Sequence, residues 1–329
     1  MIEYEMLKYV TIGGLKIGFW FTTHYLIAWP FAAYYIIKET LRKRNFDKGL
    51  DLNRMLQMFL LAFVGSFVGS RIFAFYGPWG GSCASGGFVE RFMQMISLEQ
   101  KGWVAIGGII GGIVFTFVYS KITKLKYMRY ADILAPAIAL GFFIARLGCY
   151  IAGCCFGSQT DVPWAIIKDN VPIHPTQLYN SLVDLAIFVV LVCLSERKEK
   201  KNRQDGYVLS SFVFMYAVGR FTTEFFRGDY DPSNYFFGLT TTQIICIVFF
   251  LISATLIIIN SLKESPKKRV KTGFRIRPKT YALLVSGGII ANIGAYIITP
   301  LPYLALIVIP SGLGIFFFGL TTIFSKPKN

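Results

Sequence analysis

The stretch VLSSFVFMYAVGRFTTEFFRGDYD, residues 208–231, decides the class of fold, because an apolar run leads directly into arginine and glutamate side chains. A helix needs about 20 apolar residues to cross roughly 30 Å of hydrocarbon. Burying an unpaired charge in hydrocarbon is costly, so arginine and glutamate at such a position are usually paired and often functional. The stretch therefore predicts a membrane-spanning helix with a polar site near one of its ends.

Similar apolar runs recur along all 329 residues, of which 54% are hydrophobic and only 16% are charged. Soluble domains carry roughly 25% charged residues. We therefore predict an all-α polytopic integral membrane protein, with no cleavable signal peptide in the mixed start MIEYEMLKYVTIGGLKIG. The nine predicted spans cover about residues 17–37, 55–77, 103–120, 131–153, 178–195, 207–226, 239–261, 281–299 and 303–324.

The number of lysine and arginine residues alternates between high and low in successive connections between these spans. The connections after the first, third, fifth and seventh spans, together with the tail, hold 25 of them, whereas the remaining connections and the start hold six. By the positive-inside rule the N-terminus lies outside and the C-terminus inside. The net charge of +16 is thus a signal of topology and of contact with anionic membrane lipids, and we expect no nucleic-acid partner.

Polar residues gather on two helical stripes near the predicted outer ends of the spans. Both stripes use the three- and four-residue spacings that place side chains on one helix face. The first holds Tyr216, Arg220, Glu224 and Arg227, and the second holds Arg146, Cys149, Tyr150, Gly153, Cys154 and Gly157. The glycines on the second stripe permit close approach by a neighbouring helix or by a ligand.

With Arg71 in GSFVGSRIFAFY, these stripes place three cations inside spans against one firmly intramembrane acid, Glu224. An arginine guanidinium binds phosphate oxygens bidentately, so a lipid phosphate is the natural missing anion. The alternative is that Arg220 and Glu224 form an i, i+4 pair that only lets the helix cross. That alternative leaves Arg146 and Arg71 without an acid in their own spans.

Three further features have both a structural and a functional interpretation. The run IGGIIGGI (106–113) is either a small-residue packing surface or a backbone surface that a lipid headgroup approaches closely. His174, in HPTQLYN (174–180), is either an interfacial loop residue or a proton acceptor near pH 7. The six cysteines lack metal-ligand spacing and only His24 and His174 accompany them, so no metal site is predicted.

The ordered motifs IGGIIGG, ARLGCYIAGCCFG, TDVPWAI, HPTQLYN and GRFTTEFFRGD resemble those of the bacterial prolipoprotein diacylglyceryl transferases, and GSFVGSRIF is similar to the family's arginine-bearing second span. The resemblance covers roughly residues 15–262. It implies seven spans with the N-terminus outside, in a bacterial plasma membrane, and a site that faces the outer leaflet side. The expected domains are a transmembrane core over 1–262, a basic cytoplasmic linker over 263–280, and two additional helices with a short tail over 281–329.

The resemblance also implies an activity. The diacylglyceryl group of phosphatidylglycerol moves onto the thiol of the lipobox cysteine of a preprolipoprotein, with glycerol phosphate as leaving group and no metal or soluble cofactor. Arg146 and Arg220 match the family's essential arginines, which would hold the departing phosphate. His174, Glu224 and Tyr216 are the candidates to take or relay the thiol proton. The candidate substrate-binding residues are Arg71, Gly107, Gly108, Cys149, Cys154, Gly157, Gln177, Tyr179, Asn180 and Arg227.

The chain departs from the family pattern at several positions. Ile106 stands where many members have histidine and others tyrosine, and Asn180 stands where the motif HPxQLYE ends in glutamate. Cys149 and Cys154 replace an asparagine and a glutamate, as in a GCxxAGCCxG branch of the family. Two alternatives therefore stay open. One is a paralogue that passes the lipid group to a different acceptor, with Cys154 or Cys155 as nucleophile or redox-sensitive group; the other is a non-catalytic phospholipid carrier or flippase.

Overall fold

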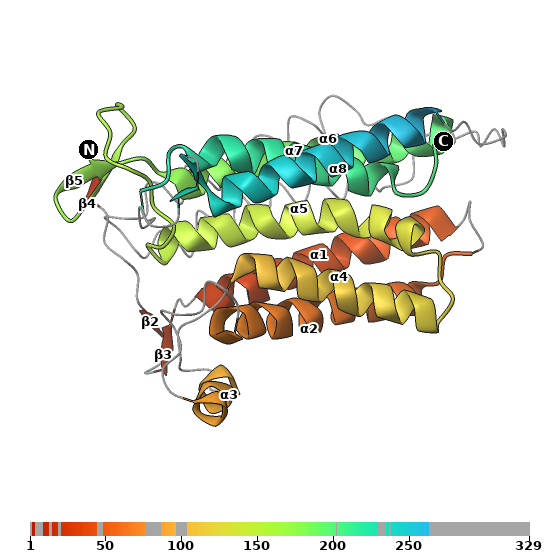
Figure 1. Cartoon of the computed structure of the whole chain (residues 1–329), viewed down its shortest axis with the longest axis horizontal. Coiled ribbons are helices and arrows are strands. Elements are labelled where there is room, and N and C mark those ends of the chain that lie inside the picture. Colours follow the sequence, from red (N-terminus) through yellow and green to blue (C-terminus); the bar gives the residue numbers. More distant parts are fainter. Residues whose placement is uncertain are drawn as a thin grey trace. The chain divides into compact units, whose positions relative to one another are not determined.

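The computed structural model describes residues 2–3, 9–12, 15–18, 21–44, 49–76, 87–96, 104–201, 203–228, 235–236 and 238–262, which are mostly helical (Figure 1). Four helical stretches are long and apolar enough to cross a membrane, namely Leu52–Tyr76, Tyr127–Ile151, Thr176–Glu199 and Thr241–Asn260, and Gly107–Ile122 is a shorter apolar helix. Large apolar side chains lie exposed along these helices, as Leu251 does at 58%. The chain is therefore a polytopic helical membrane protein.

Each of the first seven predicted spans coincides with a helix. These helices are α1 (Phe21–Arg44), α2 (Leu52–Tyr76), α4 (Ala105–Ile122), α5 (Tyr127–Ile151), α6 (Thr176–Lys201), α7 (Tyr207–Glu224) and α8 (Thr241–Leu262). Several run past the predicted ends because hydropathy marks the apolar part of a helix and not its polar turns. The two C-terminal spans predicted at 281–299 and 303–324 lie outside the described residues, so the full number of membrane crossings stays a prediction.

The chain divides into two compact units, of which one is Lys43–Tyr130 and the other comprises Met1–Arg42 and Ala131–Asn329. The first unit holds α2, α4 and the short helix α3 (Phe88–Ile96). Helices α2 and α4 lie side by side (Figure 1), and a Cβ added to Gly69 would come within 2.2 Å of the Gly107 carbonyl oxygen. Glycines thus let the two backbones touch, which supports the packing interpretation of the run at 106–113.

In the other unit, α6, α7 and α8 run side by side with α5 along them (Figure 1). Asp132, buried near the start of α5, joins three of these helices. Its carboxylate accepts hydrogen bonds from the backbone N–H groups of Gly206 and Leu209, both at 2.8 Å, and from Lys198 Nζ at 2.7 Å. Asp132 therefore caps the N-terminus of α7 from a different helix, where the chain's own cap residue is a glycine without a side chain.

Helix α1 packs on α6 in the same unit. Tyr35 and Phe188 meet edge to face with ring centroids 5.6 Å apart. Arg42 pairs with Glu39 at 2.6 Å and with Glu199 of α6 at 3.3 Å. An apolar contact and an ion-pair network thus hold these two helices together.

Short strands complete the fold. β4 (Ile166–Lys168) and β5 (Val171–Ile173) form an antiparallel hairpin, and β1 (Ile2–Glu3) pairs parallel to β4. The two residues of the hairpin loop, Asp169 at φ 52° and Asn170 at φ 63°, have the positive angles of a type I′ turn. Two further antiparallel pairs are β2 (Tyr9–Ile12) with β3 (Leu15–Gly18), and β6 (Tyr235–Phe236) with β7 (Leu239–Thr240). The β4–β5 hairpin returns the chain from the loop after α5 to the start of α6.

Candidate active site

Helix α5 ends in a Schellman motif, and the predicted helical stripe breaks there. The N–H of Gly153, at φ 70°, donates to the Tyr150 carbonyl at 3.2 Å, and the N–H of Cys154 donates to the Cys149 carbonyl at 3.2 Å. The prediction of one continuous stripe was wrong because glycine at residue 153 adopts the left-handed conformation at little cost and stops the helix. Gly157 lies in the loop that follows.

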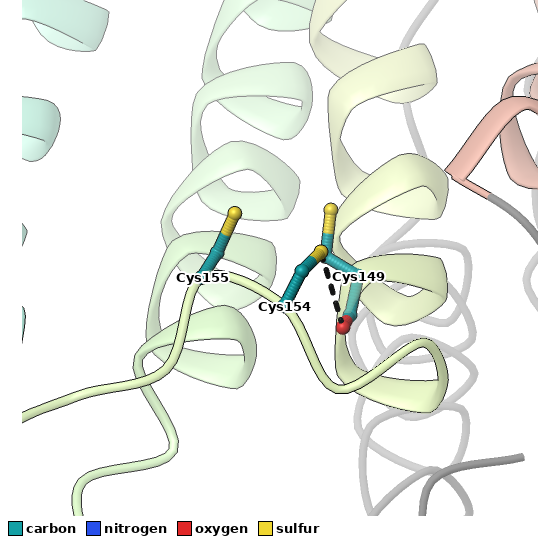
Figure 2. Close-up of side chains that lie close together, drawn as sticks. All are labelled: Cys149, Cys154 and Cys155. Atoms are coloured by element: carbon teal, nitrogen blue, oxygen red, sulfur yellow. Dashed lines mark hydrogen bonds between the residues drawn. The ribbon is translucent and has the colours of Figure 1, made fainter. Parts of the chain in front are cut away.

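The turn after α5 brings three thiols together. The Sγ atoms of Cys149, Cys154 and Cys155 all lie within 4.8 Å of one another (Figure 2), and Cys154 Sγ donates to the Cys149 carbonyl at 3.7 Å. The start of α6 fixes this segment, since Thr176 Oγ1 donates to the Cys155 carbonyl at 2.8 Å and Gln177 Nε2 donates to the Cys154 carbonyl at 2.7 Å. Gln177, a predicted substrate-binding residue, therefore positions the cysteine segment.

Gly157 is the point where three segments meet. Its N–H donates to the His174 carbonyl at 3.0 Å, and the next N–H, of Ser158, donates to the Phe226 carbonyl at 2.8 Å. Gly157 also forms an antiparallel bridge with Arg227, which lies beyond the end of α7 and not on its predicted stripe. A Cβ at Gly157 would lie 2.5 Å from the His174 carbonyl oxygen and 2.7 Å from that of Phe226. The structure thus joins the histidine motif to the arginine–glutamate motif through a glycine at which a larger residue would push the two segments apart.

His174 lies just before α6 in an aromatic cluster. Its ring centroid is 5.9 Å from that of Tyr179 and 5.1 Å from that of Phe226. The Tyr179 hydroxyl accepts a hydrogen bond from Trp164 Nε1 at 2.6 Å and shares one with His174 Nδ1 at 3.2 Å. Partial burial lowers the pKa of His174 below its ordinary value, so the ring is neutral at neutral pH. Nε2 is the ring nitrogen that remains for a substrate.

Arg220 and Glu224 form the ion pair predicted on α7, and the start of α8 completes it. Arg220 Nη2 lies 2.7 Å from Glu224 Oε2, and Thr240 Oγ1 donates to Glu224 Oε1 at 3.2 Å. Thr240 is held by a capping box, in which its N–H donates to Gln243 Oε1 at 2.9 Å and its Oγ1 accepts from the Gln243 N–H at 3.2 Å. The cap of α8 therefore fixes Glu224, and Glu224 fixes Arg220.

Asn180 joins α6 to α7. Its Nδ2 donates to the Thr176 carbonyl at 2.8 Å, and its Oδ1 accepts from Thr223 Oγ1 at 2.9 Å. Both Asn180 and Thr223 are buried. The position needs one donor and one acceptor, which an amide supplies and a carboxylate does not. The departure at residue 180 is therefore explained by packing between two helices.

Arg146 has a different environment from Arg220. Within the part of the chain that the structure describes, Arg146 forms no hydrogen bond or ion pair; Cys149, Tyr216, Cys155 and Asp184 lie close enough to act on it electrostatically. Its side chain is partly buried. A guanidinium left with unused donors away from water is costly, so this position suits an anion that comes from outside the chain.

Asp184 of α6 is an intramembrane acid that the sequence reasoning missed. It is 3% exposed and lies within electrostatic range of Arg146 and Arg220. The count of one intramembrane acid against three cations was therefore wrong, since Asp184 joins Glu224. The argument for a bound anion now depends on Arg146, which lacks a direct partner among the described residues. The available signal was an aspartate inside the apolar run NSLVDLAIFVV, four residues after Asn180.

Tyr216 borders the arginines of its own unit, and Arg71 is held by contacts within the other unit. The Tyr216 ring packs on Phe142 at 5.3 Å between centroids, and the residue interacts electrostatically with Arg146. Arg71 lies in the other unit, where Nε donates to the Met95 carbonyl at 2.9 Å and Nη2 to the Gln94 carbonyl at 3.0 Å. Arg71 therefore stabilises the C-terminal end of α3, as cations there generally do. Gly107 and Gly108 lie in that same unit on the face of α4 that packs on α2.

Comparison with known proteins identifies relatives over most of this region. Residues 8–259 match the family described as "Prolipoprotein diacylglyceryl transferase". A phosphatidylglycerol–prolipoprotein diacylglyceryl transferase of Finegoldia magna is 31% identical over 217 residues, which are 66% of this chain and 82% of the relative. The proteins of the same name from Clostridium tetani and Mannheimia succiniciproducens are 28% and 29% identical, over 83% and 91% of their own lengths and 64% and 76% of this chain.

Proposed function

Because the chain belongs to the prolipoprotein diacylglyceryl transferase family, we propose that it transfers the diacylglyceryl group of phosphatidylglycerol to the cysteine thiol of a prolipoprotein. The acceptor cysteine lies in the lipobox of that substrate. Glycerol phosphate leaves, and the product is a thioether. The observation that carries the assignment to this site is Arg146, whose guanidinium has no hydrogen-bond or ion-pair partner among the described residues and lies near Cys149 and Cys155 at the end of α5.

Arg146 and Arg220 have different roles in binding phosphatidylglycerol. Arg146 binds the phosphate of phosphatidylglycerol directly, since its donors are available to phosphate oxygens. Arg220, fixed by Glu224 at 2.7 Å, presents a second positive charge from α7. Charge that grows on the departing phosphate is stabilised by donors that are already in place, which is the usual source of the largest catalytic effect.

The acceptor thiol must lose its proton before it attacks, because the thiolate is the nucleophile. His174 is the best placed of the three candidate acceptors: its pKa is lowered by burial and its Nε2 is not used by Tyr179. Glu224 is occupied by Arg220 and Thr240, so its role is to position Arg220. Tyr216 packs on Phe142, and we assign it a structural role beside Arg146.

The remaining predicted residues shape the site. Gly157 and Arg227 hold the loop after α5 against the chain that follows α7, and Gln177 fixes the cysteine segment from α6. Tyr179 and Asn180 set the ring of His174 and the packing of α7. We place this site on the outer leaflet side of a bacterial plasma membrane. The charge pattern indicates that the N-terminus lies outside. We propose a core over 1–262, followed by a basic cytoplasmic linker over 263–280 and two further spans.

The test is a transfer assay with the purified full chain. Protein in phosphatidylglycerol liposomes receives a synthetic lipobox peptide, and mass spectrometry follows the diacylglyceryl peptide and released glycerol phosphate. A peptide with serine in place of the acceptor cysteine is the control. The expected result is a thioether product that requires the thiol. Movement of phosphatidylglycerol between leaflets without covalent product would instead identify a carrier and contradict the proposal.

A further inference from the structure

The cysteine cluster at the end of α5 has the dimensions of a metal site. The three Sγ atoms of Cys149, Cys154 and Cys155 lie within 4.8 Å of one another, and Figure 2 shows the two loop cysteines beside the helix residue. A tetrahedral zinc ion with Zn–S bonds of about 2.3 Å spaces its sulfurs about 3.8 Å apart. Small side-chain rotations therefore bring all three thiols to the spacing that zinc requires.

The backbone that carries these thiols is fixed by its surroundings. Cys155 has φ 60°, a left-handed conformation that is unfavourable for a non-glycine residue and is maintained only where neighbours enforce it. Those neighbours are Thr176 and Gln177, which hold the carbonyls of Cys155 and Cys154 at 2.8 Å and 2.7 Å. Metal ligands are held in place by hydrogen bonds of this kind from a surrounding shell.

The cluster offers three ligands and leaves a fourth position open. Among the described residues no other histidine, cysteine, aspartate or glutamate joins the group. Cys149 is 2% exposed, whereas Cys154 and Cys155 are half-buried, so two of the three cysteines are partly accessible from outside the protein. Three protein ligands with one open position are typical of catalytic zinc, and four protein ligands are typical of structural zinc.

The surrounding charge suits an anionic zinc–thiolate group. Three thiolates with Zn²⁺ carry one net negative charge, and a thiolate in the fourth position adds a second. Arg146 and Arg227 lie within electrostatic range of Cys155 and supply two positive charges. The positive potential of these two arginines therefore favours the anionic zinc–thiolate group, while the hydrogen-bond donors of Arg146 stay available for phosphate.

We propose that Cys149, Cys154 and Cys155 bind a zinc ion whose fourth ligand is the acceptor cysteine of the prolipoprotein. This inference rests on the proposed transferase function. The thiol loses its proton to His174 when it binds, and the zinc-held sulfur attacks the glyceryl carbon that bears the phosphate ester. The S–C bond forms with the sulfur electron pair, the C–O bond breaks, and glycerol phosphate leaves with that electron pair beside Arg146. The neutral thioether is a weak ligand and dissociates.

The role explains two features of the chain together. Three thiols occupy the motif in which the family resemblance has asparagine and glutamate, and Ile106 stands where many members have histidine and others tyrosine, which could exchange protons. A metal ion lowers the pKa of a thiol that binds it so far that the thiol gives up its proton readily, here to His174. Zinc thus supplies the activation that fewer proton-transferring side chains would otherwise have to provide.

Metal binding is measured first, without lipid or transfer. The reduced full chain is loaded with Zn²⁺ under anaerobic conditions, freed of excess metal and analysed for bound zinc, and Co²⁺ replaces Zn²⁺ for absorption spectra. We expect one metal ion per chain and the charge-transfer band of tetrahedral Co²⁺–thiolate. Cys154→Ser and Cys155→Ser should weaken binding by more than the roughly 10- to 100-fold that surrounding-shell changes cost. Cys193→Ser, outside the cluster on α6, should bind as the unsubstituted chain does.

The Co²⁺ spectrum then reports the fourth ligand. Adding the lipobox peptide should change the spectrum, and its serine counterpart should not; transfer should fall on chelation and return with Zn²⁺. Failure of the fully reduced chain to hold metal, a spectrum indifferent to the cysteine peptide, or equal transfer rates with and without zinc would each overturn the inference. Transfer that proceeds without zinc overturns only this inference, whereas absence of transfer from zinc-loaded and metal-free protein alike overturns the proposed function.

Discussion

Replacing Gly157 by alanine perturbs the point where three segments of the site meet. The added Cβ would lie 2.5 Å from the His174 Cβ, 2.5 Å from the His174 carbonyl oxygen and 2.7 Å from the Phe226 carbonyl oxygen. These are backbone or Cβ atoms, which cannot rotate away as the end of a long side chain can. The segments must therefore separate, and the hydrogen bonds from Gly157 N–H at 3.0 Å and Ser158 N–H at 2.8 Å stretch with them.

The magnitude follows from these contacts. Overpacking costs typically about 1–3 kcal/mol, and each weakened hydrogen bond adds up to about 0.5–1.5 kcal/mol. The free energy of unfolding should fall by about 2–4 kcal/mol. At roughly 2 °C per kcal/mol for a long chain, the unfolding midpoint in detergent should drop by about 4–8 °C. Transfer should fall as well, because the separation displaces His174.

Gly141→Ala on α5 is the matched control. A Cβ at Gly141 meets nothing within 4 Å, and alanine is favoured over glycine inside a helix by about 0.5–1 kcal/mol. Unfolding of both variants is followed by intrinsic fluorescence in the same detergent. We expect opposite signs, with Gly157→Ala less stable and Gly141→Ala slightly more stable than the unsubstituted chain. A Gly157→Ala protein that is as stable and as active as the unsubstituted chain would refute the reasoning about this junction.

Three further predictions follow from the polar contacts. Glu224→Gln should lower the free energy of unfolding by about 3 kcal/mol, because it removes the carboxylate that pairs with Arg220 at 2.7 Å, and transfer should fall with it; unchanged values in both assays would contradict this. Thr223→Val should lower the free energy of unfolding by about 1–3 kcal/mol, because it leaves Asn180 Oδ1 unpaired. Replacement of the exposed neighbour, Thr222→Val, should change that free energy by no more than about 0.5 kcal/mol, and thermal unfolding measures both. Since burial lowers the pKa of His174, its neutral form persists to lower pH than that of an ordinary histidine. Transfer should therefore be full at neutral pH and fall as the pH drops through that pKa. His174→Gln should remove this acidic fall from the pH–rate profile.

The helices could be predicted from the sequence because hydrocarbon demands a long apolar run wherever the chain crosses it. Helix ends could not, since they depend on local backbone geometry. At the end of α5 the sequence offers Gly153 as a helix terminator. However, the three- and four-residue spacings between Arg146 and Gly157 are equally typical of a helix that continues. The hairpin of β4 and β5 had a clear signal in Asp169–Asn170, which favour the positive φ angles of a two-residue turn.

Site contacts within one sequence motif could be predicted, whereas contacts that depend on the packing of separate helices could not. Arg220 with Glu224 followed from their spacing, and the structure confirms their ion pair. Asp184 was missed because its relation to Arg146 exists only when α5 and α6 pack together. The contacts of Arg71 could not be predicted, because no sequence pattern marks the two α3 carbonyls to which it donates.

The measurement that tests the central claim most directly is the transfer rate of Arg146→Gln with phosphatidylglycerol and the lipobox peptide. Glutamine removes the charge and shortens the side chain while keeping a polar amide, and the unfolding midpoint of the variant is measured alongside. If Arg146 holds the departing phosphate, kcat should fall by about 100- to 1,000-fold, as when one preorganised transition-state donor is removed, while the midpoint stays within a few degrees. A folded Arg146→Gln protein with an unchanged transfer rate would contradict the account.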